Sequence, residues 1–326
     1  MRFGTRRFIA AAGAIAALAT PGWAHAQADY PSKPVRLIVA FPPGGPTDLV
    51  SRVIAQKVSE QIGQQVLVEN RPGANGNIGA EAAAKAAPDG YTVFYNTSAI
   101  TLSPALYSKL SFDPLKDFTP VVLTAVVPLV IAVHPSVPAN NIKEFIAYLK
   151  ANPGKATYGS AGNGNVTHLG AFLFLQANGL DAVHVPYKGS APSLTDLVGG
   201  QTQFTAETVN AALPYIRDKR LKALAVMSLK RTSVLPDVPT LNESGMKGFE
   251  VGAWQGIVMP AKTPPAIVQR WNAEVMKTLA DPEVKARLAA QGAEPLGSTP
   301  EQYGAYLKSE VERWAKVVKA TGAKLD

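Results

Sequence analysis

Hydrophobic residues in the first third of the chain alternate between two periods, one typical of strands and one typical of helices. Residues 35–41 form a short apolar, β-branched run, which predicts a buried strand. Apolar residues then recur at helical spacing from Val50 to Ile62, and Gly63 is the expected stop. The alternation continues with two more strands and an alanine-rich helix, predicted at 65–69, 91–95 and 78–87. Strands that alternate with helices favour parallel βαβ units.

The middle of the chain contains a long β-branched run, residues 121–133, interrupted by Pro128. Because proline removes a ladder hydrogen bond from a central strand, we expect two strands that meet near Pro128, followed by a crossover into a second domain. The alternation then resumes, with further strands expected at 155–158, 181–186, 201–205, 223–228 and 249–259. Further helices are expected at 211–217, 264–279 and 300–321. Three more are expected of which one boundary is given: one begins at Val166, one ends at Val198 and one begins at Pro282.

Two glycine-rich loops each connect a predicted strand to a predicted helix. The first is Phe41-Pro-Pro-Gly-Gly-Pro-Thr-Asp48, in which Gly45 is the expected N-cap and Pro46 the first helical residue. The second is Gly159-Ser-Ala-Gly-Asn-Gly-Asn165. Open α/β sheets bind ligands at such strand ends, and glycine lets an anion approach the free amides of a helix start. Either the two loops are the two sides of one ligand site, or both are tight turns without a ligand.

The first 26 residues have the pattern of an export signal. Arg2, Arg6 and Arg7 precede an apolar run, and Ala24-His25-Ala26 is a small-x-small cleavage motif. The apolar run is shorter than the roughly 20 residues that a permanent membrane anchor needs. We therefore predict cleavage after Ala26 and a protein that is free in the periplasm. The arginine pair is compatible with both the twin-arginine and the general export route.

Composition narrows the class of protein further. The chain has 326 residues, more than one hydrophobic core usually holds, so two domains are expected. It contains no cysteine, which excludes disulfides, thiolate metal sites and a thiol nucleophile. Removing the three arginines of the signal lowers the 32 basic residues to 29 against 24 acidic ones, a net charge of +5. This mild positive charge suits anions, and no basic run indicates nucleic-acid binding.

Motifs for catalysis are weak. After the signal the chain has the histidines His134, His168 and His184, and none has metal-ligand spacing. The segment around Ser160 resembles a nucleophile elbow, but Tyr158 stands where that motif requires glycine. The sequence therefore favours a binding protein without a cofactor or a metal rather than an enzyme. A hydrolase that uses Ser160 or His168, and a ligand sensor in signalling, are the alternatives.

Ordered motifs along the chain resemble one known family over essentially its whole length after the signal. They include Tyr30-Pro-x-Lys-Pro34, the first glycine-rich loop, Glu69-Asn-Arg-Pro-Gly-Ala74, Pro88-Asp-Gly-Tyr91, Tyr158-Gly-Ser-Ala-Gly162, Val185-Pro-Tyr-Lys-Gly189 and Pro239-Thr-Leu-x-Glu243. This set is similar to that of the Bug-type substrate-binding proteins of tripartite tricarboxylate transporters. The resemblance implies a two-domain clamshell α/β fold, like that of type II periplasmic binding proteins, with the ligand cleft between the domains.

The resemblance also implies a function and a division of the chain. Members of that family capture small carboxylates, such as di- or tricarboxylates, amino acids or aromatic acids. They pass these ligands to the large and small membrane subunits of a permease. The first domain would combine residues 27–129 with 246–326, and the second would be residues 130–245. We expect a monomer that binds no nucleic acid.

Mapped residue by residue, the resemblance implies a carboxylate site with two sides. The first side is Phe41, Pro43, Gly44, Gly45, Thr47 and Asp48, and the second is Ser160, Ala161, Gly162, Asn163, Gly164 and Thr167, with His168 behind. Asn75, Ser98 and Tyr187 would complete the cleft. Glu207 stands where many members of the family have aspartate, and its longer side chain is expected to reshape the distal end of the site. Amides at the two helix starts, rather than Lys188, are expected to hold the carboxylate.

Overall fold

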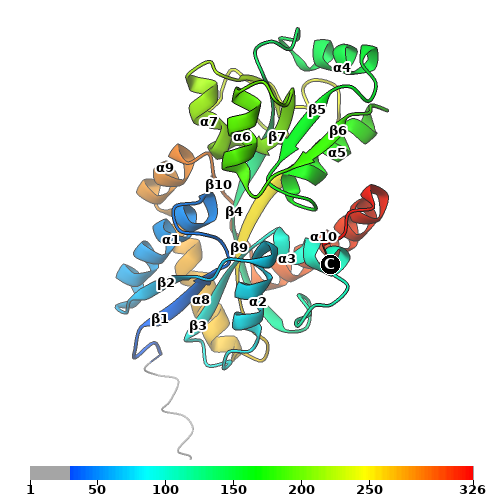
Figure 1. Ribbon diagram of the computed structural model, residues 1–326. Helices are drawn as coiled ribbons and strands as arrows, with labels where there is room; N and C mark the ends of the chain where they lie inside the picture. The colour runs from blue at the N-terminus through cyan, green and yellow to red at the C-terminus, as the bar shows by residue number, and fades with distance from the viewer. Residues whose placement is uncertain (1–29, 326) are drawn as a thin grey trace, which may run out of the picture.

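The computed structural model describes residues 30–325, and the predicted signal peptide with its cleavage site lies outside the described residues. The described chain forms two α/β lobes joined by one mixed sheet (Figure 1). The N-terminal and C-terminal parts of the chain build one lobe, and the middle of the chain builds the other. The expected two-lobed α/β architecture is therefore confirmed.

The first lobe is built on three parallel strands. Its elements are β1 (Val35–Val39), α1 (Pro46–Ile62), β2 (Val66–Asn70), the 3-10 helix η1 (Ala74–Gly76), α2 (Asn77–Ala84), β3 (Thr92–Thr97) and α3 (Ala99–Leu106). β1 lies between β2 and β3 and is parallel to both. Because side chains alternate along β1, Leu37 packs with α1 on one face and Ile38 packs with α2 on the other. Gly45 is the N-cap of α1 and Pro46 its first residue, as predicted.

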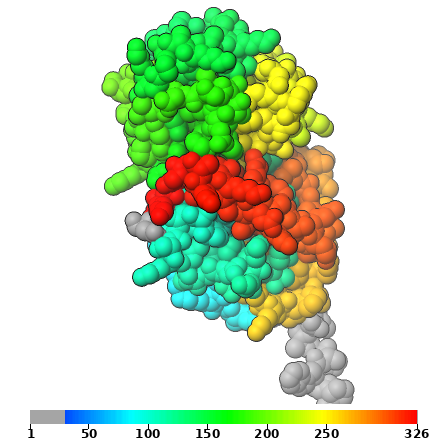
Figure 2. All heavy atoms as spheres, turned by 90° about the vertical axis from the view of Figure 1, so that its right-hand side faces the viewer, coloured from blue at the N-terminus to red at the C-terminus, as the bar shows by residue number. Residues whose placement is uncertain are grey.

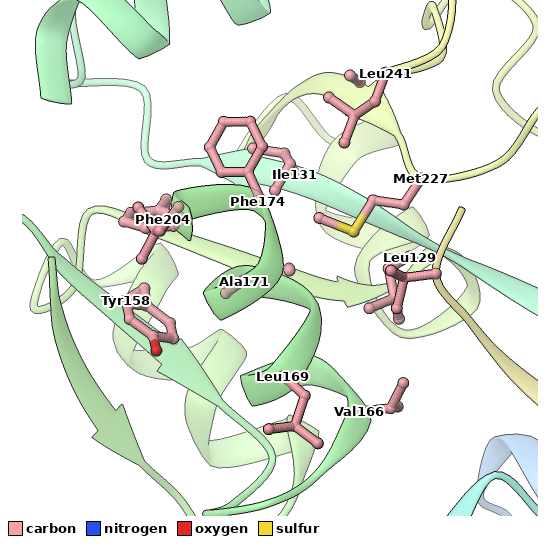
Figure 3. Close-up of a cluster of buried hydrophobic side chains, with 14 of the residues drawn as sticks. Leu129, Ile131, Tyr158, Val166, Leu169, Ala171, Phe174, Phe204, Met227 and Leu241 are labelled. Atoms are coloured by element: carbon pink, nitrogen blue, oxygen red, sulfur yellow. The ribbon is translucent and has the colours of Figure 1, made fainter. Parts of the chain in front are cut away.

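The second lobe repeats the parallel arrangement in the middle of the chain. Its elements are α4 (Ile142–Ala151), β5 (Thr157–Ser160), α5 (Val166–Ala177), β6 (Val183–Pro186), α6 (Ser190–Val198), β7 (Phe204–Thr208), α7 (Val209–Arg217) and β8 (Lys222–Val226). β5 lies between β6 and β7 and is parallel to both. Leu169 and Phe174 of α5 belong to the same buried cluster as Phe204 of β7 and Ile131 (Figure 3). The strands and helices expected here are present, with boundaries shifted by a few residues.

Two long antiparallel strands, β4 (Phe118–Val133) and β9 (Gly252–Pro260), connect the lobes. β4 pairs with β9 as far as Pro128, and from Leu129 onward it pairs with β7. The prediction of two strands that meet near Pro128 is wrong, because the chain continues through the proline as one strand. Pro128 is tolerated since it lies where β4 changes its partner, so that its missing N–H falls between the two ladders. The sheet has the strand order β2-β1-β3-β9-β4-β7-β5-β6, and β8 also pairs with β4.

The C-terminal part of the chain returns to the first lobe. It comprises α8 (Pro265–Ala280), α9 (Pro282–Ala290), β10 (Glu294–Pro295) and α10 (Pro300–Thr321). α10 begins with a capping box between Thr299 and Gln302 and crosses the waist of the molecule between the lobes (Figure 2). Its Trp314 donates from Nε1 to Glu310 Oε2 at 2.8 Å, and Trp254 of β9 donates to the same oxygen at 2.9 Å. α10 is thereby tied to a strand that links the lobes.

Sequence periodicity did not predict α3 or β10. α3 contains Pro104, and its Leu102 and Leu106 belong to the core cluster of the second lobe. Trp314 and Val318 of α10 belong to the same cluster. The second lobe therefore packs on α3 and α10 through a continuous apolar core.

Candidate functional site

A cavity of about 300 Å³ lies between the two lobes. One side comes from the loops that follow β1, β2 and β3, and the other from the loops that follow β5, β6 and β7. These loops lie at the carboxyl ends of parallel strands, where open α/β sheets bind ligands. β9 adds Ala253 and Gln255, and Leu102, Val127 and Val166 make part of the cavity apolar.

Helix N-termini dominate the electrostatics of this cavity. It is lined by the N-cap residues of α1, α3, α5, α6 and α7, which are Gly45, Ser98, Asn165, Gly189 and Thr208. Each N-terminus carries a partial positive charge and unpaired N–H groups. Among the described residues that line the cavity there is no lysine, arginine or histidine. The arrangement suits an anion that is bound by backbone dipoles rather than by a cationic side chain.

Free backbone donors lie at the starts of α1 and α5, whereas several glycine amides of the two loops are already paired. Within residues 30–325, the amides of Thr47 and Asp48 in α1 and of Val166 in α5 have no hydrogen-bond partner. The loop amides are engaged within their own loops: Gly44 donates to Asp48, Ala161 to Thr167, Gly162 to Ser160 and Gly164 to His168. The loops therefore shape the cavity, while the first turns of α1 and α5 offer the donors.

Asp48 fixes the first glycine-rich loop from behind. Its Oδ2 accepts from the Gly44 amide at 2.8 Å and from Arg52 Nε at 2.9 Å, and its Oδ1 accepts from Asn70 Nδ2 at 2.9 Å. Burial alone would raise the pKa of this carboxyl, but the hydrogen bonds outweigh burial and hold the pKa below its usual value. Gly44 has a φ of +75°, a conformation that favours glycine.

Neutral side chains fix the second glycine-rich loop. Ser160 Oγ accepts from the Gly162 amide, donates to the Gly162 carbonyl and lies 2.7 Å from His184 Nε2. The rings of His168 and His184 stack with 3.8 Å between their centroids, and His168 Nδ1 accepts from the Gly164 amide. Burial, with a smaller contribution from His184, lowers the pKa of His168 to about 3. Burial lowers the pKa of His184 to about 4, so both rings are neutral at physiological pH.

The contact between Ser160 and His184 does not build an accessible nucleophile. Ser160 is 0% exposed and is not among the residues that line the cavity. His168, the histidine considered for a hydrolase, contacts the Gly164 amide instead of Ser160. Within residues 30–325 no group of three or more acidic, histidine or cysteine side chains could hold a metal ion. The geometry favours positioning of the loop over catalysis.

The structure brings part of the predicted site together at the cavity. The predicted residues that line it are Phe41, Gly45, Thr47, Asn75, Ser98, Ala161, Thr167 and Glu207. Those that lie behind or beside it are Pro43, Gly44, Asp48, Ser160, Gly162, Asn163, Gly164, His168 and Tyr187. Tyr187 donates to Asp196 at 2.7 Å, and Asn163 donates to the carbonyl of Lys324 at 3.2 Å. The ligand-binding role of each of these residues stays a prediction.

Sequence reasoning missed several polar residues at the cavity, namely Thr97, Asn165, Ser190, Thr208 and Gln255. Asn165 carried a signal, because asparagine is a preferred N-cap and its side chain accepts from the Thr167 amide at 3.1 Å. Gln255 carried none, since it lies inside β9 between apolar neighbours.

Three polar side chains at the cavity carry a buried atom without a hydrogen-bond partner: Asn75 Nδ2, Glu207 Oε2 and Gln255 Oε1. Buried polar atoms are normally paired, so each of these atoms calls for an explanation. Asn75 also has a φ of +54°, next to Ala74 at +47°, and consecutive left-handed residues other than glycine are strained. Strained backbone of this kind is concentrated at functional sites.

A wider groove of about 810 Å³ opens beside the cavity. The groove and the cavity share Pro42, Gly45, Pro46, Gly189 and Ser190. The groove therefore adjoins the cavity where the loop before α1 faces the loop before α6. Lys188 and Arg217 line this groove and not the cavity itself.

Comparison with known proteins gives matches over nearly the whole chain. A family model described as "Tripartite tricarboxylate transporter family receptor" matches residues 50–323. The structure of the periplasmic binding protein BugD is 38% identical with a TM-score of 0.78, over 90% of this chain and 99% of that one. The protein Rpa4515 of R. palustris with adipate is 37% identical, with a TM-score of 0.82 over 91% of this chain and 100% of that one. MatC from Rhodopseudomonas palustris with bound malate is 34% identical, with a TM-score of 0.77 over 89% and 100%.

Proposed function

The chain belongs to the receptor family of tripartite tricarboxylate transporters, and from this premise we propose that it captures a small carboxylate in the periplasm for a transporter of that kind. The family consists of periplasmic binding proteins, whose fold this chain has. The observation that carries the proposal is the convergence of the N-termini of α1, α3, α5, α6 and α7 on a cavity without a cationic side chain. A carboxylate is the ligand that such a set of dipoles favours.

Backbone donors are expected to contribute more to the binding free energy than the nearby Lys188. A carboxylate between α1 and α5 would accept from the free amides of Thr47, Asp48 and Val166. Hydrogen bonds to a charged group contribute about 1.5–3 kcal/mol each, whereas an exposed ion pair contributes about 0–1 kcal/mol. Lys188 lines only the outer groove, so we infer that it contributes little to affinity.

The size and lining of the cavity support a short ligand. Its volume of about 300 Å³ is at the small end of the range for small-molecule sites. The apolar side chains of Leu102 and Val127 suit a short carbon chain, and the relatives Rpa4515 and MatC were solved with adipate and malate. We infer that this chain takes a di- or tricarboxylate, an amino acid or an aromatic acid of similar size.

Ligand capture would involve closure of two domains, residues 27–129 with 246–326 against residues 130–245. The change of partner in β4 after Pro128 supports a hinge near Val130, with its counterpart near Gly245. The apolar core that α3 and α10 share with the second lobe favours a small closing movement over a wide one. Small-angle scattering should show a smaller radius of gyration with adipate or another bound acid. An unchanged radius would indicate a preformed, rigid cleft.

Export would bring the chain to the periplasm, where the large and small membrane subunits of the permease can receive the ligand. Within residues 30–325 no helix has both the length and the apolar character that crossing a membrane requires. Intact-mass measurement of protein from the periplasm should give a chain that begins at Gln27. A mature chain that still contains Arg2 would contradict the predicted cleavage.

The proposed function is tested by thermal shift with a panel of small carboxylates. At 100 times its dissociation constant a ligand stabilises the folded state by about 2.7 kcal/mol, which raises Tm by several degrees. Mass spectrometry of acid released from freshly purified protein then identifies the natural ligand. Folded, ligand-free protein that responds to no carboxylate would refute the proposal, and a chemically altered ligand after incubation would favour the hydrolase.

A further inference from the structure

Glu207 occupies an unusual place, because it is the ionisable side chain of the cavity lining and is 0% exposed. It lies near the end of β7, directly before Thr208, the N-cap of α7. Its Oε1 accepts from the Thr208 amide at 2.7 Å and from Thr208 Oγ1 at 3.1 Å. Its Oε2 has no partner within residues 30–325.

This one-sided hydrogen bonding is the pattern of a neutral carboxylic acid. An ionised carboxylate has two acceptor oxygens, and burying one of them unpaired is costly. A neutral acid instead has a carbonyl oxygen that accepts and a hydroxyl that donates, which matches an occupied Oε1 and a vacant Oε2. Burial raises the pKa of Glu207, and the hydrogen bonds from Thr208 do not offset the effect of burial.

Within residues 30–325, no charged side chain on the elements packed against β7 contributes to the pKa of Glu207. β4, which pairs with β7, has no ionisable residue between Phe118 and Val133. The ionisable residues on the other elements packed against β7 have other partners or lie in the outer groove. Tyr158 of β5 and His168 of α5 stack on His184, Asp196 of α6 accepts from Tyr187, Tyr215 of α7 contacts Arg220, and Arg217 of α7 lines the groove.

We propose that Glu207 acts as a neutral carboxyl group whose Oε2–H donates a hydrogen bond to a second carboxylate of the ligand, so that the site selects dicarboxylates over monocarboxylates of the same length. This inference rests on the proposed function and adds a residue that sets ligand specificity. An ionised Glu207 would repel a second carboxylate, whereas the neutral acid supplies a hydrogen-bond donor for it. Where free Glu207 is partly ionised, binding takes up a proton from solvent, and this proton stays on Oε2.

Two variants distinguish the effect of a hydrogen-bond donor at the Oε2 position from the effect of a negative charge on Glu207. In Glu207→Gln, the donors at Thr208 orient the amide oxygen into the place of Oε1, so that Nε2 takes the place of Oε2 and still donates. Glu207→Leu has a similar volume and no donor. Calorimetric titration of the wild type and both variants with adipate and with hexanoate compares two ligands of equal length.

We expect the wild type and Glu207→Gln to bind adipate about 10- to 100-fold more tightly than hexanoate, and Glu207→Leu to lose this preference. Glu207→Gln that loses adipate binding as Glu207→Leu does would overturn the inference, because it would show that the negative charge is needed. Equal binding of both acids by the wild type would overturn the inference and leave the proposed function standing. A wild type that binds neither acid would also overturn the inference, and the proposed function would fall only if no carboxylate of the panel binds.

The pH dependence gives a second readout, which still decides if Glu207→Leu fails to fold. For the wild type, the Kd for adipate should rise by up to tenfold per pH unit above the pKa of free Glu207, and titration in buffers of different ionisation enthalpy should show proton uptake. A Kd that is constant from about pH 6 to 8, with binding retained in Glu207→Gln, also supports a neutral Glu207. Proton release on binding would overturn the inference.

Discussion

The two glycine-rich loops have the same plan in the sequence, but different chemistry holds them in place. The loop before α1 is fixed by a buried carboxylate, Asp48, which accepts from the Gly44 amide, Asn70 and Arg52. The loop before α5 is fixed by Ser160 and a stacked pair of neutral imidazoles. Both solutions leave the amides of the first helical turn free. The comparison shows that the site requires a backbone shape, and that the side chains behind it can differ in charge.

The largest loss of stability is expected from removing the Asp48 carboxylate, which fixes the loop before α1. Asp48→Ala removes the hydrogen bonds from the Gly44 amide, Arg52 and Asn70 Nδ2, although Asn70 Nδ2 keeps the Phe41 carbonyl as a partner, and a hydrogen bond to a charged group contributes about 1.5–3 kcal/mol. We expect a loss of about 3 kcal/mol in the free energy of unfolding, measured by urea denaturation at pH 7. Arg52→Met is the control. We expect it to lose only about 1 kcal/mol of unfolding free energy, because the Arg52 side chain is 49% exposed. Similar losses in the two variants would contradict the assigned role of Asp48.

The next largest effect concerns binding, through the shape of the two loops. Gly162 has a φ of +143°, and an added Cβ would lie 3.2 Å from the Tyr187 carbonyl oxygen. A Cβ at Gly45 would lie 3.3 Å from the Pro42 carbonyl oxygen. We expect Gly162→Val and Gly45→Val to weaken adipate binding by roughly 10- to 100-fold while the protein stays folded, in line with the loss of one charge-assisted hydrogen bond. Calorimetry with Lys188→Met should show a much smaller change, and the reverse ranking would refute the amide site.

As the pH falls, the stability contributed by His168 and His184 should be lost at a higher pH than the stability contributed by Asp48. The pKa of His168 is about 3 when folded and 6.5 in the unfolded chain, so the unfolded chain binds more protons between these values. Stability should therefore fall as the pH drops below 6.5, by at most about 1.4 kcal/mol per pH unit for His168 and by less for the more exposed His184. Asp48 contributes stability that is present above pH 3.8 and is lost only as the pH falls through its lower folded pKa.

Chemical unfolding at pH 7, 6 and 5 measures this difference. His168→Gln keeps an acceptor for the Gly164 amide without a group that titrates in this range, so its stability should depend less on pH. A wild type that is equally stable at pH 7 and pH 5 would show that the buried rings are not neutral as described.

The smallest effect is expected from the hydroxyl of the second loop. Ser160→Ala removes the contacts with Gly162 and His184 and should cost about 1 kcal/mol of unfolding free energy. Ser193→Ala is a matched control, because Ser193 Oγ is buried without a partner and its removal should be neutral. Adipate affinity should change less than about fivefold in Ser160→Ala. Loss of a measurable hydrolytic activity in this variant would revive the enzyme alternative.

Local signals made most of the scaffold predictable. Gly45 and Pro46 specify the start of α1 through capping preference and a fixed φ, and both depend on a few neighbouring residues only. The course of β4 was not predictable in the same way. Whether Pro128 breaks a strand depends on the partners of β4 on each side of the proline, and those partners, β9 and β7, lie far away in the chain.

The candidate site was likewise predictable only where its features depend on neighbouring residues in the sequence. The glycine-rich loops could be predicted, because glycine and proline mark strand-to-helix turns. The hydrogen bonds that their amides donate within the loops could not be predicted. Gln255 and the unpaired oxygen of Glu207 depend on which side chains meet in the space between the lobes. Neither periodicity nor motif spacing encodes that meeting. The family resemblance placed Glu207 at the site, but it did not assign the chemistry of the carboxyl group.

The shared contact of two indoles with Glu310 gives the protein a built-in optical reporter. After the predicted cleavage the chain keeps Trp254, Trp271 and Trp314, and two of these donate to one carboxyl oxygen where β9 passes α10. Both indoles are almost completely buried, so their emission should be blue-shifted in the folded protein. Because β9 links the lobes, a closing movement would change the field around both rings at once. Ligand capture should therefore be measurable as a change in intrinsic fluorescence, in real time and without a label.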